Sequence, residues 1–177
     1  MIFYFGKPYS FTHVAALRRF GKKEKYFSKE TIEDALNSVK TSSVAVVPIE
    51  NTYGGMIIDT VDAFVNGSCK GKTILEEIEM KIELYLIGKN AAHIRKIYSH
   101  AYPLKVSEEW IKKNAPYAKI ESVASTSEAA IKISREKHSC AIASKEAAEH
   151  YGIDVLDKIV LEGKNNLTRF FVIGLRH

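Results

Sequence analysis

A hydroxyl, a guanidinium and an aromatic ring follow one another near the C-terminus, in Thr168, Arg169 and Phe170. An arginine fork suits a carboxylate, and a positioned hydroxyl can donate a hydrogen bond to a reacting oxygen. The apolar run 170–173 predicts a buried strand, and residues 162–166 predict the loop that enters it. Side chains alternate between the faces of a strand, so Thr168 and Arg169 share a face only if the strand begins after them. On its own, the segment fits a last core strand as well as a reactive site.

Four further groups of polar side chains stand where a predicted strand gives way to a helix or turn. Each offers a hydroxyl or an amide, together with free backbone N–H groups, to an anion. Each one, taken singly, is also explained by plain helix N-capping, which stabilises a helix by about 1 kcal/mol. The groups are Ser10/Thr12, Asn51/Thr52, Ser125/Thr126 and Ser144.

The motifs of several common catalytic classes are missing from the sequence. The six histidines have no nucleophile-elbow context, and no zinc-protease, dinucleotide-binding or P-loop pattern occurs. Cys69 and Cys140 lack the spacing of metal ligands and are interpreted as buried thiols. The sequence therefore predicts neither a metal nor a cofactor.

The bulk composition is typical of a soluble globular protein, with 177 residues, 46% hydrophobic and 27% charged. The net charge of +5 would attract a dianionic substrate, although scattered surface lysines explain it equally well. Basic residues form no stripe with aromatics, so we expect no nucleic-acid partner. No apolar run is long enough to span a bilayer, and the short apolar N-terminus lacks a basic start. We therefore expect a cytoplasmic protein without a membrane partner.

Strands and helices alternate in the first part of the chain, which predicts a parallel sheet with helices packed on it. Gly21 is expected to end the first helix, which begins at Ser10 or Thr12, and Pro48 to end the second strand. Ile57, Val61, Phe64 and Val65 should form the apolar face of the third helix. The predicted strands are 2–5 and 44–47, and the predicted helices follow residue 10, cover 28–40 and follow residue 55.

The strongest strand pattern is the alternation over residues 78–87, which is long enough to run from one lobe into another. A second α/β set follows, with strands at 97–99, 120–123 and 140–143 and helices at 104–114, after Ser125 and at 144–151. We predict an α/β fold of two three-layer lobes, the first from residues 1–77 and 162–177, the second from 78–161. A ligand is expected in the cleft between them.

Five segments match, in order, the motifs of one known family. They are Gly6 with Ser10-Phe11-Thr12-His13-Val14-Ala15-Ala16, Val47-Pro48-Ile49-Glu50-Asn51-Thr52-Tyr53-Gly54-Gly55, Ile97-Tyr98-Ser99-His100, Ser125-Thr126-Ser127-Glu128-Ala129-Ala130 and Asn166-Leu167-Thr168-Arg169-Phe170. On these matches the whole chain resembles the catalytic domain of the prephenate dehydratases. The resemblance implies two lobes like those of a type II periplasmic binding protein.

The chain departs from the family pattern at three places. Tyr9 stands where the family usually has a second glycine, so the first loop is expected to differ in shape. Ala101 and Tyr102 intervene before Pro103, which usually follows the Ser-His motif at once. The family commonly carries a C-terminal ACT regulatory domain, and with the chain ending at His177 we expect none here.

The resemblance implies that the substrate is prephenate, which loses water and carbon dioxide to give phenylpyruvate. Thr168 matches the presumed acid of the family, and we expect it to donate a hydrogen bond to the leaving hydroxyl. We expect Arg169 or a helix N-terminus to hold the pyruvyl carboxylate, with Phe170 packing the wall of the site or the core beneath it. The other substrate-binding candidates are Asn51, Thr52, Gly55, Ser99 and Thr126.

Three alternatives stay open. Arogenate, the amino analogue of prephenate, ranks lower because no clear carboxylate is left to pair with its ammonium. A binding module of the same fold would also fit. A Thr168 that faces the cleft would favour the enzyme, and a buried Thr168 would favour binding alone. The domain could also work with a separate regulatory subunit. We expect a homodimer or higher homo-oligomer.

Overall fold

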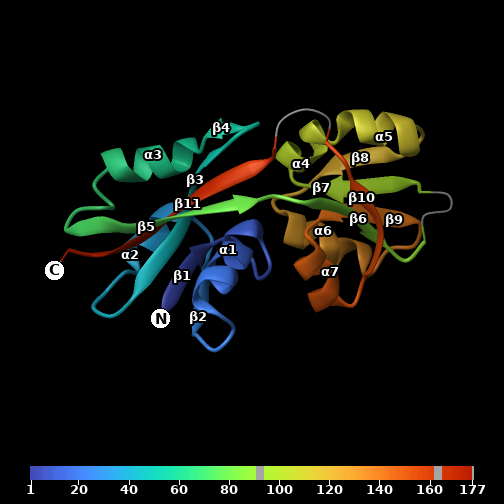
Figure 1. Ribbon diagram of the computed structural model, residues 1–177. Coiled ribbons are helices and arrows are strands. Elements are labelled where there is room, and N and C mark those ends of the chain that lie inside the picture. The colour runs from blue at the N-terminus through green and yellow to red at the C-terminus, as the bar shows by residue number, and fades with distance from the viewer. Residues whose placement is uncertain (91–93, 162–164, 177) are drawn as a thin grey trace. The chain divides into compact units, whose positions relative to one another are not determined.

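The computed structural model describes residues 1–90, 94–161 and 165–176. Their contacts divide the chain into two compact units, residues 1–81 with 165–177 and residues 82–164. Each unit contains one mixed sheet with helices packed on it (Figure 1), which confirms the predicted α/β class. The described parts of the chain contain no helix that is long and apolar enough to cross a membrane.

The sheet of the first unit has the strand order β2-β1-β3-β11-β5, with β4 paired to β3. β1 runs parallel to β2 and β3, whereas β11 runs antiparallel to both of its neighbours, β3 and β5. The last segment of the chain therefore lies between two strands from its first half. The strands are β1 (Ile2–Phe5), β2 (Tyr26–Lys29), β3 (Val44–Asn51), β4 (Gly55–Met56), β5 (Lys72–Lys81) and β11 (Leu167–Leu175).

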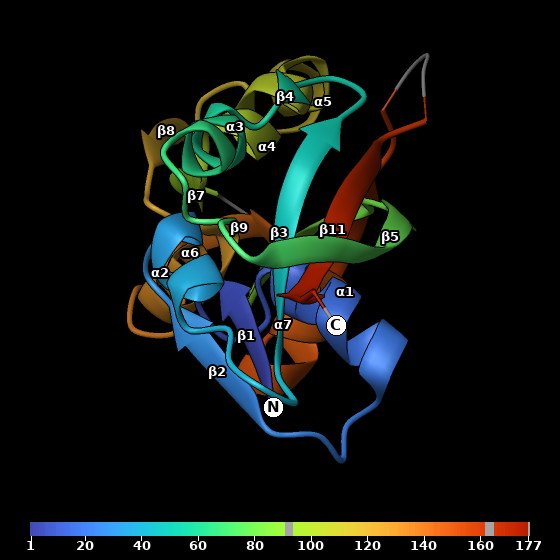
Figure 2. The ribbon, with the colours of Figure 1, turned by 90° about the vertical axis from the view of Figure 1, so that its left-hand side faces the viewer.

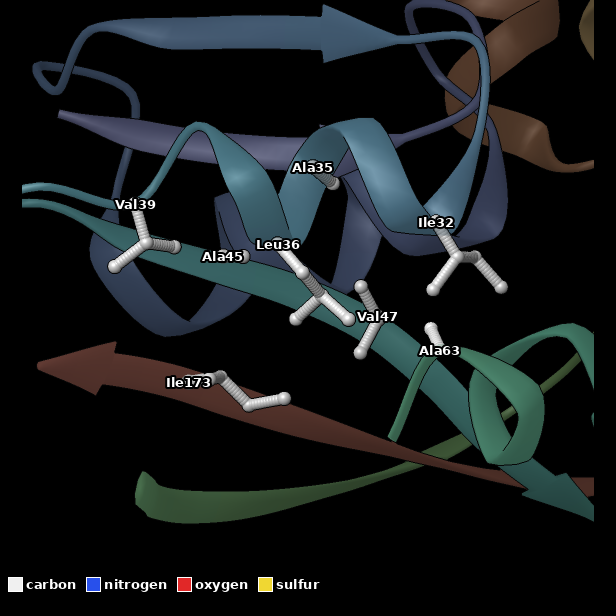
Figure 3. Close-up of a cluster of buried hydrophobic side chains, with 8 residues drawn as sticks. All are labelled: Ile32, Ala35, Leu36, Val39, Ala45, Val47, Ala63 and Ile173. Atoms are coloured by element: carbon white, nitrogen blue, oxygen red, sulfur yellow. The ribbon is translucent and has the colours of Figure 1, made fainter. Parts of the chain in front are cut away.

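Three helices cover the two faces of this sheet: α1 (Phe11–Phe20), α2 (Ile32–Asn37) and α3 (Ile58–Val65). Leu36 of α2 and Ala63 of α3 pack with Val47 and Ile173 in one buried cluster (Figure 3). On the other face, Tyr4 stacks on His13 of α1. The first unit is therefore a three-layer sandwich.

The second unit contains a sheet of order β10-β6-β9-β7-β8. Its central strand, β9, is buried at every position, because α4 and α5 lie on one side of the sheet and α6 and α7 on the other (Figure 1). The strands are β6 (Leu84–Gly88), β7 (Lys96–Ser99), β8 (Lys119–Ser122), β9 (Ser139–Ala143) and β10 (Asp154–Ile159). The helices are α4 (Ala101–Val106), α5 (Glu108–Asn114), α6 (Thr126–Ile133) and α7 (Lys145–Tyr151).

The predicted helix starts are confirmed at three serines. The hydroxyls of Ser10, Ser125 and Ser144 each accept a hydrogen bond from the backbone N–H three residues later. Ser10 is therefore the N-cap of the first helix, and Thr12 lies inside it. At the other ends, Gly21 and Gly152 follow α1 and α7 as predicted, with positive φ angles.

The predicted helix over 28–40 was wrong at both ends. Tyr26–Lys29 form β2, which pairs with β1, and the helix begins only at Ile32. Thr31 caps it by accepting a hydrogen bond from Asp34 N, and the helix ends at Asn37. The periodic apolar positions were real, but pairing with β1 fixed the residues before them as strand.

Pro48 does not end its strand, because β3 continues to Asn51. The pairing of β3 with β11 shifts register between Arg169 and Phe170, and such a bulge is one of the places where a strand tolerates proline. The last strand is also longer than predicted, since it already begins at Leu167. The predicted loop over 162–166 lies partly outside the described residues.

Three other predictions about the elements were wrong. The alternating run 78–87 does pass from one unit to the other, as expected, but it is two strands, β5 and β6, and not one. The helix over 104–114 is broken at Ser107 into α4 and α5. In α3, Thr60 and Ala63 are buried while Val65 is exposed, because Thr60 turns toward β3 and donates a hydrogen bond to Pro48 O.

Candidate active site

Two successive cross-strand pairs join β3 to the start of β11. Thr168 lies opposite Asn51, and Arg169 lies opposite Glu50. Figure 2 shows β3 and β11 next to each other in the first unit, and β11 pairs with β5 along its other edge. Because β11 begins before both Thr168 and Arg169, their side chains point to opposite faces of the sheet.

Asn51 holds the start of β11 through its side-chain amide. Its Oδ1 accepts hydrogen bonds from Tyr53 N (2.8 Å) and Gly54 N (3.0 Å). These two donors fix the orientation of the amide, so that Nδ2 must face β11. Nδ2 donates its two protons to three acceptors, one proton being shared: Asn166 Oδ1 (2.8 Å), Leu167 O (3.0 Å) and Thr168 Oγ1 (2.8 Å). Asn51 therefore positions the hydroxyl of Thr168.

The hydroxyl of Thr168 accepts the hydrogen bond from Asn51, so its own proton remains available for donation. Within residues 1–90, 94–161 and 165–176, no atom accepts that proton. A hydroxyl that accepts a bond from an amide becomes a better donor, because neighbouring hydrogen bonds polarise one another. Only 8% of the Thr168 surface is exposed. This burial favours the alternative in which the domain binds a ligand without catalysis.

Thr52 and Gly55 shape the turn that follows Asn51. Thr52 Oγ1 donates to Asn165 O (2.7 Å) and accepts from Leu167 N (3.0 Å), so its hydroxyl is already engaged within the chain. Gly55 lies opposite Asn51 in the β3–β4 hairpin, with φ of +73°, where glycine is favoured. In this structure both residues hold the turn and strand that carry Asn51 and Thr168.

Arg169 is engaged by two carboxylates of the first unit. Its Nε lies 3.1 Å from Glu50 Oε2, which its Nη2 also contacts, and its Nη1 lies 3.5 Å from Glu77 Oε1. The hydrogen bond to Glu50 raises the pKa of the guanidinium above its ordinary value. The structure thus gives Arg169 protein partners on β3 and β5, which flank its own strand.

The remaining predicted site residues are buried. Phe170 is 1% exposed and lies in the core, opposite Pro48 and Ile78. In the second unit, Ser99 is fully buried, and its hydroxyl donates to Ile142 O (2.6 Å). Thr126 is the first residue of α6 and is also buried. The structure brings Asn51, Thr52, Gly55, Thr168, Arg169 and Phe170 together in the first unit.

Two contributors were not among the predicted site residues. Asn166 is buried and accepts a hydrogen bond from Asn51, and its place in the Asn-x-Thr-Arg-Phe segment was the available signal. Glu77 contacts Arg169 from β5, and no local pattern marks it. Glu50, which stands in the second of the five family-like segments, pairs with Arg169.

Tyr9 accommodates the backbone shape that a glycine would take in the first loop. Its φ of +61° lies in the left-handed region, which a non-glycine residue seldom adopts. Tyr9 N donates to His13 Nδ1 (2.9 Å), and the two rings meet edge to face. These contacts offset part of the conformational cost.

The family of the chain follows from its comparison with known proteins. The family model described as prephenate dehydratase matches residues 2–177. The chain belongs to the prephenate dehydratase family. A bifunctional chorismate mutase/prephenate dehydratase of Aquifex aeolicus is 34% identical over 98% of the chain, which covers 48% of that protein. A prephenate dehydratase of Methanocaldococcus jannaschii is 36% identical over 81% of the chain and 52% of that protein.

The chain thus spans about half the length of these curated relatives. Among solved structures, the prephenate dehydratase of Staphylococcus aureus is 26% identical to it, with a TM-score of 0.81. That alignment covers all of the chain and 67% of the solved protein. Family and fold agree with the resemblance found in the sequence motifs.

Proposed function

We propose that this chain converts prephenate to phenylpyruvate, water and carbon dioxide. Its family membership and the names of its relatives support this activity. The structural observation that carries the proposal is the hydrogen bond from Asn51 Nδ2 to Thr168 Oγ1, which leaves the threonine proton free for donation. This is the arrangement that a departing hydroxyl requires.

The reaction breaks two bonds of the substrate and makes its ring aromatic. The electron pair of the bond between the ring and its carboxylate moves into the ring as carbon dioxide leaves. The C–O bond of the ring hydroxyl then breaks, and the departing oxygen must gain a proton. Thr168 is a weak acid by its own pKa, so we assign it as a positioned donor to that oxygen, with the proton supplied ultimately by water.

The substrate carboxylates need different surroundings. The ring carboxylate loses its charge in the reaction, so tight binding of that group would favour the ground state and slow the reaction. The pyruvyl carboxylate keeps its charge, and Arg169 or the N-terminus of α6, where Thr126 stands, would suit it. We keep Thr52, Gly55, Ser99 and Phe170 in the proposed set as residues that shape the site, because the hydroxyls of Thr52 and Ser99 are bonded within the chain and Phe170 is buried.

Arogenate is less well supported as the substrate. It would need a carboxylate for its ammonium group, and the Glu50 carboxylate beside Asn51 is already paired with Arg169. The binding-module alternative has one specific observation in its favour, the small exposed fraction of Thr168. The two functions differ in turnover, which is directly measurable.

We also propose that the protein is cytoplasmic and forms a homodimer or higher homo-oligomer. Both cysteines are free thiols, as a reducing compartment would keep them.

Met56, Ile58 and Val65 expose apolar side chains on β4 and α3, where a second copy could bury them. Light scattering should give a mass above that of one chain, and Val65→Lys should lower it. A single-chain mass for the parent protein would reject the oligomer.

The test of the activity compares Thr168→Val with Thr168→Ser in phenylpyruvate formation from prephenate. Valine keeps the shape of threonine, and Asn51 Nδ2 retains Asn166 Oδ1 and Leu167 O as acceptors, so the fold should survive. We expect kcat to fall by about 10²-fold or more in the valine variant, the scale of general acid catalysis. The serine variant should retain most of the turnover. Equal turnover in the parent and the valine variant would remove Thr168 from the mechanism.

A further inference from the structure

The position of one bulge in β3 decides which residue lies opposite Thr168. β11 pairs Thr168 with Asn51 and Arg169 with Glu50, but Phe170 with Pro48, so Ile49 is the extra residue on β3. If the bulge moved past Thr168 toward the end of the strand, Thr168 would lie opposite Glu50 and Arg169 opposite Ile49. Both cross-strand side-chain pairs would then be lost.

The two pairs lie on opposite faces of β3 and β11, one residue apart. On one face Asn51 Nδ2 donates to Thr168 Oγ1, and on the other the guanidinium of Arg169 binds Glu50. A one-residue change of pairing cannot preserve either contact, because side chains alternate along both strands. The ion pair therefore opposes the same shift that would separate Asn51 from Thr168.

β5, which pairs with the other edge of β11, supplies a second carboxylate to the guanidinium of Arg169. Glu79 lies directly opposite Arg169 on β5, yet the contact is made by Glu77, two residues away on that strand. Diagonal neighbours of this kind are within reach of a long side chain. Arg169 directly follows Thr168, and its side chain thus binds residues on both strands that flank β11.

We infer that Arg169 is a positioning residue: its pair with Glu50 holds the β3 bulge at Ile49 and so keeps Asn51 bonded to Thr168. The catalytic consequence rests on the proposed function, whereas the effect on pairing does not. In this role the guanidinium binds Glu50 and not the pyruvyl carboxylate, so of the two groups proposed above to hold that carboxylate only the N-terminus of α6 remains.

The test measures kcat and KM for Arg169→Gln, for Glu50→Gln and for the variant that carries both changes. Glu79→Gln is the matched control. Glu79 is an exposed carboxylate that faces the same arginine in the strand register. Arg169→Gln and Glu50→Gln should each lower kcat by up to about 10²-fold, as a misplacement of about 1 Å can, with little change in KM. The double variant should be no worse than either single one, and Glu79→Gln should match the parent protein.

A second readout tests the pairing without any turnover. Nuclear magnetic resonance of the Asn51 side-chain amide should show protons protected from solvent exchange in the parent and in Glu79→Gln. Protection should be lost in Arg169→Gln and in Glu50→Gln. An unchanged Asn51 signal in both variants, with KM raised only by Arg169→Gln, would overturn the inference in favour of substrate binding. A parent protein without turnover but with the expected loss of protection would reject the proposed function alone.

Discussion

Replacing Asn51 with aspartate should reverse the hydrogen bond on which the proposed chemistry depends. The substitution keeps the size of the side chain and exchanges Nδ2 for an oxygen. That atom lies 2.8 Å from Thr168 Oγ1 and 2.8 Å from Asn166 Oδ1. The threonine hydroxyl would rotate to donate to the new carboxylate, and the Asn166 amide would turn its nitrogen toward it. The proton of Thr168 would then be held within the protein.

The size of the effect follows from the bond that must be broken before Thr168 can serve the substrate. A hydrogen bond to a charged group contributes about 1.5–3 kcal/mol, which corresponds to a loss of about 10- to 150-fold in kcat. The fold should survive, because the other oxygen of the new carboxylate would still accept from Tyr53 N and Gly54 N, and Leu167 O still accepts from Thr52 N (2.9 Å). Urea unfolding of the variant checks this point.

Steady-state formation of phenylpyruvate is the assay, and Asn165→Asp is the control. Asn165 is exposed in the same segment, so this change adds the same charge without touching Thr168. The control should stay within a few-fold of the parent protein in kcat, and any shared rise in KM would report charge repulsion of the substrate. If Asn51→Asp kept the kcat of the control, the direction of the Asn51–Thr168 bond would be irrelevant to turnover.

Three further predictions concern stability. Tyr9→Ala should be less stable than Tyr9→Gly by about 1 kcal/mol in urea, because only glycine adopts a φ of +61° without strain. Gly88→Ala should destabilise by about 1–3 kcal/mol, since its Cβ would lie 2.9 Å from Cys140 Sγ, and adding Cys140→Ala should restore part of this loss. The Tyr98 hydroxyl lowers the pKa of Glu136, so the stability from this carboxylate is present above its unfolded pKa, near 4.5, and is lost as pH falls through the lower folded value. Glu136→Gln should therefore flatten the fall in Tm between about pH 5 and pH 3.

Local signals in the sequence were enough to predict where helices begin and which strands are buried. Ser125 and Ser144 cap helices through bonds to residues three positions away, so the information lies within one turn. The strand over Cys140–Ala143 is continuous and apolar because helices cover both faces of its sheet. In contrast, β2 and β10 are edge strands with mostly partly buried or exposed residues, which leaves little apolar periodicity to detect.

The candidate site depends on contacts between distant parts of the chain. Asn51 and Thr168 are 117 positions apart, and only the register of β3 against β11 brings them together. The register contains a bulge next to Pro48 on β3. The sequence alone predicts that the strand ends at this proline. The chemistry of Arg169 predicts a carboxylate partner, but it cannot distinguish a substrate from Glu50, which is distant in sequence and adjacent only in the sheet.

The most direct measurement of the central claim follows the atoms of prephenate carrying a ¹³C label in its ring carboxylate. With the parent protein, nuclear magnetic resonance should show labelled carbon dioxide and phenylpyruvate forming in equal amounts, faster than in a control without protein. Thr168→Val should slow the formation of both products by about 10²-fold or more. Prephenate that binds to the folded parent protein and stays intact would contradict the account and identify the domain as a binding module.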